Sequence, residues 1–171
     1  MTRLRRSAKG HIIKLKPFLS KRIHFDMHKL ESDFYRADLE IRGLDHSGPS
    51  YQGRVYLNNP KADYDTPTTA DKGYAGSFFV FGHGGCLGDM GHCDIHAERK
   101  KFDAIPNPVT PENISIIVTD QLKKLAKRTK EFTVTIVPIL AGGMMNPKEL
   151  DTEHIVNLEK ISIVTYDLEE Q

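Results

Sequence analysis

The sequence predicts a mainly all-β protein, an antiparallel β-sandwich that carries one short helix. Three observations predict this fold class. Apolar and polar residues alternate along several short stretches, which is typical of half-buried strands. Polar segments rich in Gly, Pro, Asp and Thr separate these stretches, and one short stretch has helical spacing. At 171 residues, the chain is long enough for one domain with a buried core and too short for two comfortable ones.

The first clear strand is expected over YRADLEIRG (35–43). Ala37, Leu39 and Ile41 fall on one face of such a strand, and charged residues fall on the other. This alternation predicts a strand with one face in the core and one face in water.

The next strand is expected over YQGRVYLN (51–58), with Val55 and Leu57 turned inward. A long polar loop follows at 59–73. The stretch YAGSFFVFG (74–82) then has large apolar residues at consecutive positions, so both faces of a strand would be apolar. Because a strand buried on both faces has this composition, we expect it to be a central strand.

The helix is expected directly after a strand over 114–120, where Thr119 or Asp120 can cap it. Apolar residues recur at helical spacing in Leu122, Leu125 and Ala126. The basic run KKLAKRTK (123–130) is interpreted as the solvated face of this helix. Two further strands are expected over 131–139 and 158–167.

Composition and charge place the chain among ordinary soluble globular proteins, with 39% hydrophobic and 27% charged residues. The net charge of +1 does not favour binding of nucleic acid by the whole molecule. Residues 1–30 form a basic, partly ordered arm before a sandwich domain over 31–171, and Ile23 and Phe25 share one face of a possible additional strand in the arm. Since no apolar run has the length of a membrane span and no apolar stretch follows the basic start, we expect a cytoplasmic protein without membrane contact.

The segment FGHGGCLGDMGHCDIH (81–96) contains both cysteines and three of the eight histidines of the chain, spaced by glycines. Thiolate and imidazole are ligands of zinc and of copper, and glycines allow the backbone to bring four of them together. Adjacent His92 and Cys93 seldom bind one ion together, because neighbouring side chains diverge in extended backbone. The predicted metal ligands are His83, Cys86, Cys93 and His96, with His92 as a substitute.

Three other interpretations of this segment remain open. A disulfide between Cys86 and Cys93 would close a short loop, although it requires an oxidising compartment. The cysteines could instead be packing residues beside surface histidines. Cys93 and His92, with Asp89 or Asp94 nearby, also contain the parts of a Cys–His nucleophile pair.

Candidates elsewhere in the sequence are weaker. Met144 and Met145 could offer thioethers to Cu(I), but such a pair is more typical of a loop edge. His46 and His154 are interpreted as surface histidines.

The order of several motifs resembles the C-terminal β-sandwich domain that accompanies type-3 copper proteins, namely plant polyphenol oxidases, tyrosinases and molluscan hemocyanins. The resemblance covers about residues 34–167. The motifs that carry it are GYAGSFFVFGH (73–83), ISIIVTDQLKKL (114–125), EFTVTIVPI (131–139) and the closing strand at 160–166. The preceding stretch 35–59 looks like the opening hairpin of that domain.

The resemblance implies an accessory domain without its oxidase core. The type-3 copper centre needs six histidines on a helical bundle. In this chain His24 and His28 have the HxxxH spacing of such helices, but they lie in a poorly helical segment, and one such pair cannot build a dicopper centre. We therefore expect a non-catalytic domain that binds and covers a protein partner, either an oxidase core or a second copy. The strand 73–82 would form the partner-facing edge, unless its aromatic residues pack under the loop 59–73. The alternative is a small stand-alone copper or zinc metalloenzyme, a copper-dependent oxidoreductase in the first case, with its site in the 83–96 loop.

Overall fold

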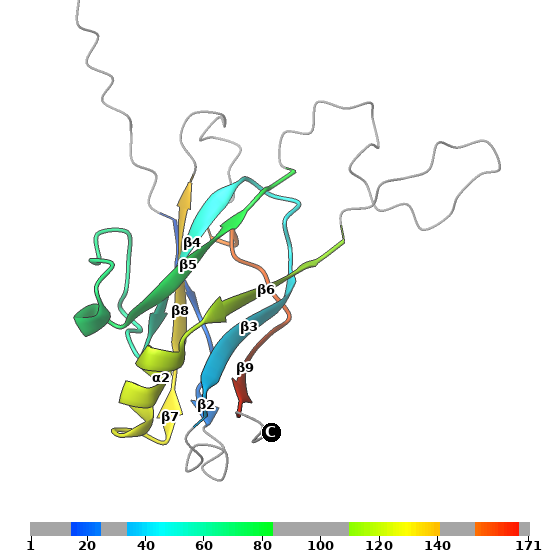
Figure 1. The fold of residues 1–171 in the computed structure, drawn as a ribbon. Helices are drawn as coiled ribbons and strands as arrows, with labels where there is room; N and C mark the ends of the chain where they lie inside the picture. Colours follow the sequence, from blue (N-terminus) through cyan, green and yellow to red (C-terminus); the bar gives the residue numbers. More distant parts are fainter. Residues whose placement is uncertain (1–14, 25–33, 84–109, 141–152, 168–171) are drawn as a thin grey trace, which may run out of the picture.

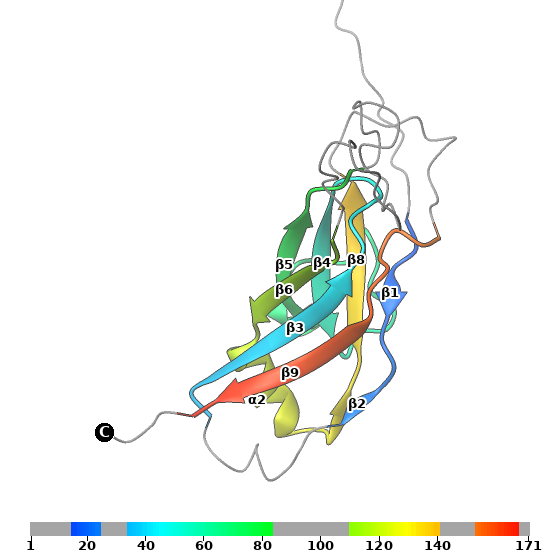
Figure 2. The same ribbon diagram turned by 90° about the vertical axis from the view of Figure 1, so that its right-hand side faces the viewer.

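A computed structural model describes residues 15–24, 34–83, 110–140 and 153–167. In these residues the protein is a sandwich of antiparallel sheets with one α-helix at an end, which confirms the predicted fold class (Figures 1 and 2). The strands are β1 (Phe18–Leu19), β2 (Ile23–His24), β3 (Arg36–Leu44), β4 (Tyr51–Leu57), β5 (Tyr74–Val80), β6 (Glu112–Ile117), β7 (Glu131–Phe132), β8 (Val134–Leu140) and β9 (Lys160–Tyr166). The helical elements are the 3-10 turn η1 (Ala70–Lys72) and the helix α2 (Thr119–Ala126).

One sheet of the sandwich has the strand order β1-β8-β4-β5, and the other has the order β6-β3-β9. A short ladder of β2 and β7 extends the first layer at one end. Every pair of neighbouring strands among the described residues is antiparallel. The core lies between the two larger sheets, where inward side chains of β3 face those of β4 and β8.

The strand β3 confirms the predicted core face, because Ala37, Leu39 and Ile41 are fully buried, whereas Asp38 on the predicted water face is buried as well. The residues between them lie on the outer face of the sheet, where Arg36 forms a two-pronged ion pair with Asp38 at 2.7 and 2.8 Å. This pairing neutralises a carboxylate that is only 3% exposed.

Two predictions of strand arrangement are wrong. The stretch 35–59 does not form a paired hairpin, because β3 pairs with β6 and β9 while β4 pairs with β5 and β8. The connection from β3 to β4 therefore crosses from one sheet to the other. The strand β5 is also not central, since among the described residues it pairs with β4 alone and forms an edge of its sheet.

The helix α2 begins at Thr119, so neither Thr119 nor Asp120 is its N-cap. The N-cap position belongs to Val118, which offers no capping side chain, and the Thr119 hydroxyl oxygen instead accepts a hydrogen bond from the backbone N–H of Ala37 at 3.0 Å. Leu122 is fully buried and anchors the helix to the core. No helix in the described ranges is long and apolar enough to cross a bilayer.

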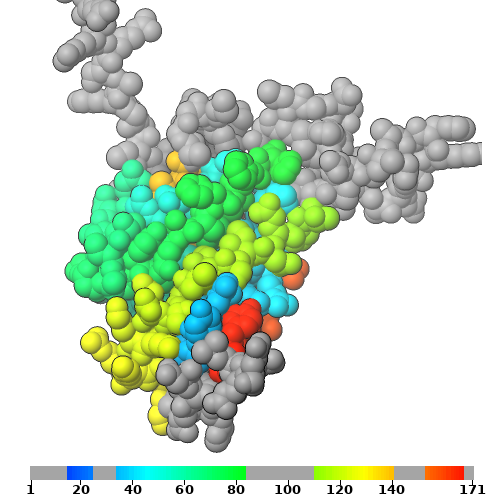
Figure 3. All heavy atoms as spheres, viewed as in Figure 1, coloured from blue at the N-terminus to red at the C-terminus, as the bar shows by residue number. Residues whose placement is uncertain are grey.

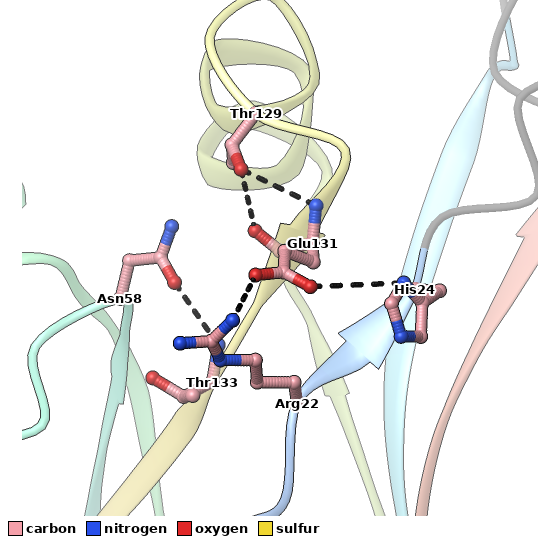
Figure 4. Close-up of polar contacts among 6 residues, drawn as sticks. All are labelled: Arg22, His24, Asn58, Thr129, Glu131 and Thr133. Atoms are coloured by element: carbon pink, nitrogen blue, oxygen red, sulfur yellow. Dashed lines mark hydrogen bonds and ion pairs between the residues drawn. The ribbon is translucent and has the colours of Figure 1, made fainter.

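Part of the basic arm belongs to the sandwich. Leu15 is buried in the main core, and β1 and β2 pair with β8 and β7. Figure 4 shows the arm at β7, where the carboxylate of Glu131 lies 2.7 Å from the guanidinium of Arg22 and 3.8 Å from Nδ1 of His24. Because Arg22 and His24 are largely exposed, these ion pairs add little stability beside the strand pairing.

Candidate functional site

The candidate site lies at the end of the sandwich where β5 leads into the Cys/His segment. Along β5, Phe78 and Val80 point into the core, whereas Phe79 is 67% exposed and Phe81, just beyond the strand, is 78% exposed. Both faces of this stretch are therefore apolar, but one face is buried and the other is exposed. Two neighbouring outward positions carry aromatic side chains into solvent.

The loop 58–73 does not cover these aromatic residues. It packs on a separate small cluster on the outer face of the same sheet, formed by Tyr56, Ala62 and Val137 with Tyr74 and Ile139 against them. The alternative of a second core layer under this loop therefore applies to Tyr56 and Tyr74, and not to Phe79 or Phe81.

The imidazole of His46 connects the two chain segments that lead into and out of residues 84–109. Its Nε2 lies 2.7 Å from the carbonyl oxygen of Thr110, which can only accept, so Nε2 carries the hydrogen and donates it. Its Nδ1 lies 3.5 Å from the carbonyl oxygen of Phe81 and 3.5 Å from a carboxylate oxygen of Glu112. The backbone of His46 also takes part, since its carbonyl oxygen accepts a hydrogen bond from the backbone N–H of His83 at 2.9 Å. His46 thus links residues on both sides of the Cys/His segment.

The prediction that His46 is a surface residue is wrong, because its side chain is only 8% exposed. Its burial results from the convergence of the two segments on the connection between β3 and β4. The ring of His83 packs edge-on against it, with the ring centroids 4.9 Å apart. The prediction for His154 is confirmed, since this residue is exposed.

Tyr51, the first residue of β4, lies in the core near this end of the sandwich. It is 2% exposed, and its ring makes an edge contact with that of Phe78 at a centroid distance of 6.3 Å. Its hydroxyl is buried and has no hydrogen-bond partner among the described residues. Burial, with smaller contributions from the charges of Asp45 and Glu112, raises the pKa of the Tyr51 hydroxyl.

Of the predicted metal ligands, His83 lies in the described part of the chain, and its side chain is placed beside His46. Within the described ranges, no three His, Cys, Asp or Glu side chains come together as a metal-binding group. The remaining residues of the predicted sites lie outside the described residues, and these are Cys86, Asp89, His92, Cys93, Asp94, His96, Met144 and Met145. Metal binding, the disulfide and the Cys–His pair therefore all stay predictions.

Sequence reasoning missed His46, Glu112 and Tyr51 as neighbours at this end of the molecule. No local pattern marks them, because His46 lies in a turn-forming stretch and Glu112 follows a proline. Only the pairing of β3 with β6, and of β4 with β5, brings their segments together.

No protein-family model matches the chain, and no curated protein matches it. Solved structures that are similar include the latent aurone synthase (polyphenol oxidase) from its natural source, with 17% identity and a TM-score of 0.49 over 93% of this chain. The recombinantly expressed enzyme gives 17% identity and a TM-score of 0.49 over 92% of this chain. Its form co-crystallised with hexatungstotellurate(VI) gives 18% and 0.47 over 90%.

These structures are polyphenol oxidases, the class of protein that the sequence motifs resemble. The chain spans about a quarter of their length, with 25%, 26% and 24% of each chain covered. At this identity and TM-score, the likeness concerns the arrangement of strands and does not extend to activity or to copper binding.

Proposed function

We propose that this chain is a non-catalytic accessory domain that docks on the oxidase core of a type-3 copper protein and covers it. The sequence resemblance supports this proposal, because it covers the sandwich and leaves out the histidine-rich helical bundle. In this proposal the dicopper centre belongs to the partner, and this chain contributes the surface that closes over it.

The observation that carries the proposal is the exposure of Phe79 and Phe81. Large aromatic side chains are enriched among the residues that anchor protein interfaces, and isolated soluble domains seldom expose neighbouring ones without a function. These two side chains project from the edge strand β5 and the residues just beyond it. A partner could bury both rings and also reach the edge of β5 that pairs with no strand among the described residues.

An activity assay separates this function from that of a stand-alone metalloenzyme. The isolated chain, supplied with copper, is assayed for oxidation of catechol and of a monophenol, and free copper at the same concentration serves as the blank. We expect no turnover above the blank. Robust turnover by the isolated chain would show that it is an oxidoreductase itself and would overturn the accessory role.

We further propose that His83, Cys86, Cys93 and His96 bind one zinc or copper ion, with His92 as a substitute. This proposal rests on the chemistry of the donor set and on the fixed position of His83 at the end of β5. A bound metal would order a glycine-rich segment whose backbone entropy opposes folding. Copper would make the segment a loading site for the partner, whereas zinc would make it structural.

Elemental analysis of protein purified without added metal tests this second proposal. Stoichiometric metal that is absent from the Cys86→Ser/Cys93→Ser variant would support it. A mass lower than that of the free dithiol by two hydrogens, with no metal present, would instead establish the disulfide.

A further inference from the structure

A groove lies between the loop 58–73 and the helix α2, at the end of β5 opposite to Phe79 and Phe81. Figures 1 and 3 show the two elements side by side on the same face of the molecule. Asn58, Lys72 and Gly73 line one wall, and Gln121, Lys124 and Arg128 line the other. Neither wall is used by the function proposed above.

Backbone and amide hydrogen bonds fix the loop wall of the groove. The backbone N–H of Leu57 donates to the carbonyl oxygen of Gly73 at 2.8 Å. The side-chain amide of Asn59 donates to the carbonyl oxygen of Lys72, also at 2.8 Å. Asn58 adopts a positive φ of 53° and exchanges two hydrogen bonds with Thr133, at 2.9 and 3.0 Å. The wall is therefore held in place at both ends of the loop.

The side-chain amide nitrogen of Asn58 is a hydrogen-bond donor without a partner among the described residues. Its side-chain oxygen accepts the N–H of Thr133, and Figure 4 shows its amide nitrogen directed away from that contact. Asn58 lines the groove, so this nitrogen is placed to serve an acceptor there.

The charges along the groove are mainly positive. Lys124 and Arg128 are four residues apart and so lie on one side of the helical segment, and neither forms an ion pair with another described residue. Lys72 faces them from the loop, and its ammonium lies 3.5 Å from the carboxylate of Asp71, the acidic residue of the lining. A hydrogen bond from Thr69, followed by the charge of Lys72, lowers the pKa of Asp71, which therefore stays ionised at neutral pH. The lining keeps an excess of positive charge, and its apolar part consists of Leu57, Ala70 and Leu125.

We infer that this groove is a docking site for an extended acidic peptide segment of a partner protein. Carboxylates of the segment would lie against Lys72, Lys124 and Arg128, and one apolar side chain would lie against Leu125. Charge complementarity selects this occupant, because the lining offers cations and amide donors to an anionic chain. The described residues of the lining include no aromatic side chain on which a base could stack, which disfavours single-stranded nucleic acid.

The test uses a fluorescent peptide of about twelve residues, composed of glutamate and leucine, and a matched peptide with glutamine in place of glutamate. Binding is followed by fluorescence anisotropy at low salt, and backbone amide NMR shifts locate it. We expect saturable binding of the acidic peptide, at least about tenfold weaker binding of the glutamine peptide, and shifts that cluster in the loop 58–73 and in α2.

Charge-reversal variants test the position of the site. Lys124→Glu/Arg128→Glu should weaken binding of the acidic peptide at least about tenfold. Lys127→Glu/Lys130→Glu is the matched control, because it makes the same change in net charge on neighbouring exposed residues that do not line the groove. Circular dichroism verifies that both variants are folded.

Three results would overturn the inference. The acidic peptide could fail to bind, or both double variants could weaken it equally, which would indicate non-specific attraction. A single-stranded oligothymidylate could produce the same shifts with equal or higher affinity, which would assign the groove to nucleic acid. Since the groove and the exposed aromatic residues are separate surfaces, failure here leaves the proposed function to be judged by its own assay.

Discussion

The hydroxyl of Tyr51 lowers the stability of the domain as long as it has no partner in the core. A buried donor without an acceptor costs about 1–3 kcal/mol of desolvation free energy. Tyr51→Phe removes this group and keeps the ring that packs on Phe78. We expect the free energy of unfolding in urea to stay constant or to rise by about 1 kcal/mol. A clear loss of stability would show that the hydroxyl has a partner.

The raised pKa of Tyr51 also predicts how stability depends on pH. The pKa in the folded protein lies above the ordinary value of 10.0, so the folded state holds this proton at a pH where the unfolded state has released it. Below pH 10 the titration of this group therefore does not change the free energy of unfolding, and above pH 10 the free energy of unfolding falls as the pH rises. Urea unfolding between pH 9 and 11 should show a smaller loss for Tyr51→Phe than for the unaltered protein, and identical slopes would contradict the prediction.

His46 is expected to stabilise the fold by joining the segments on both sides of residues 84–109. His46→Ala leaves the carbonyl oxygen of Thr110 without its 2.7 Å donor and removes a buried ring. We expect a loss of about 1–3 kcal/mol in the free energy of unfolding. The control is His154→Ala at an exposed position, which should change stability by less than about 0.5 kcal/mol. Equal effects of the two variants would refute the linking role.

At the scale of the elements, the packing of β5 on β4 depends on Gly53. A Cβ at this position would lie 2.3 Å from Cζ of Phe78, so this buried ring would have to shift within the core. Gly53→Ala should therefore cost about 1–3 kcal/mol through overpacking. Gly48→Ala is the matched control, because nothing lies within 4 Å of the added methyl group.

A second variant shows whether the ring of Phe78 causes this loss. If it does, Gly53→Ala should cost less in a Phe78→Leu background than alone, and a double-mutant cycle in urea measures the difference. Strict additivity of the two substitutions would rule out the clash as the cause.

The elements could be predicted from the sequence wherever local periodicity decides the structure. The alternation around Leu39 predicted the apolar side chains of β3 that are buried, though not the burial of Asp38, and the helical spacing around Leu122 located α2. The edge position of β5 could not be predicted, because a strand that is apolar on both faces can be a central strand or an edge strand with one exposed apolar face. Only long-range pairing distinguishes the two arrangements.

The candidate site was predicted less completely than the fold. His83 was proposed as a metal ligand from the composition of its segment; the structure places its ring beside His46, and metal binding there stays a prediction. His46 was misjudged, because its burial depends on two segments that converge from distant parts of the chain. For Phe79, the sequence left two possibilities, exposure at a partner-facing edge and burial under the loop. Only the positions of the sheet and of the loop 58–73 distinguish them.

At the scale of the whole molecule, the two proposed surfaces lie at opposite ends of β5. Phe81 follows the groove residue Gly73 by eight positions, which corresponds to roughly 25 Å along an extended chain. One partner could contact both ends, or two partners could bind independently. Variants at each end can therefore be assayed without direct interference from the other.

The central claim is that Phe79 and Phe81 dock this domain on an oxidase core, and inhibition of such a core tests it most directly. A polyphenol oxidase core freed of its own C-terminal domain is titrated with this chain while catechol oxidation is measured. The account predicts saturable inhibition, at least about tenfold weaker for Phe79→Glu/Phe81→Glu, and unchanged for Ile117→Glu, which alters an exposed apolar residue on the other sheet. All variants should remain folded by circular dichroism. Undiminished oxidation at saturating concentrations of the chain, or full inhibition by the double variant, would contradict the account.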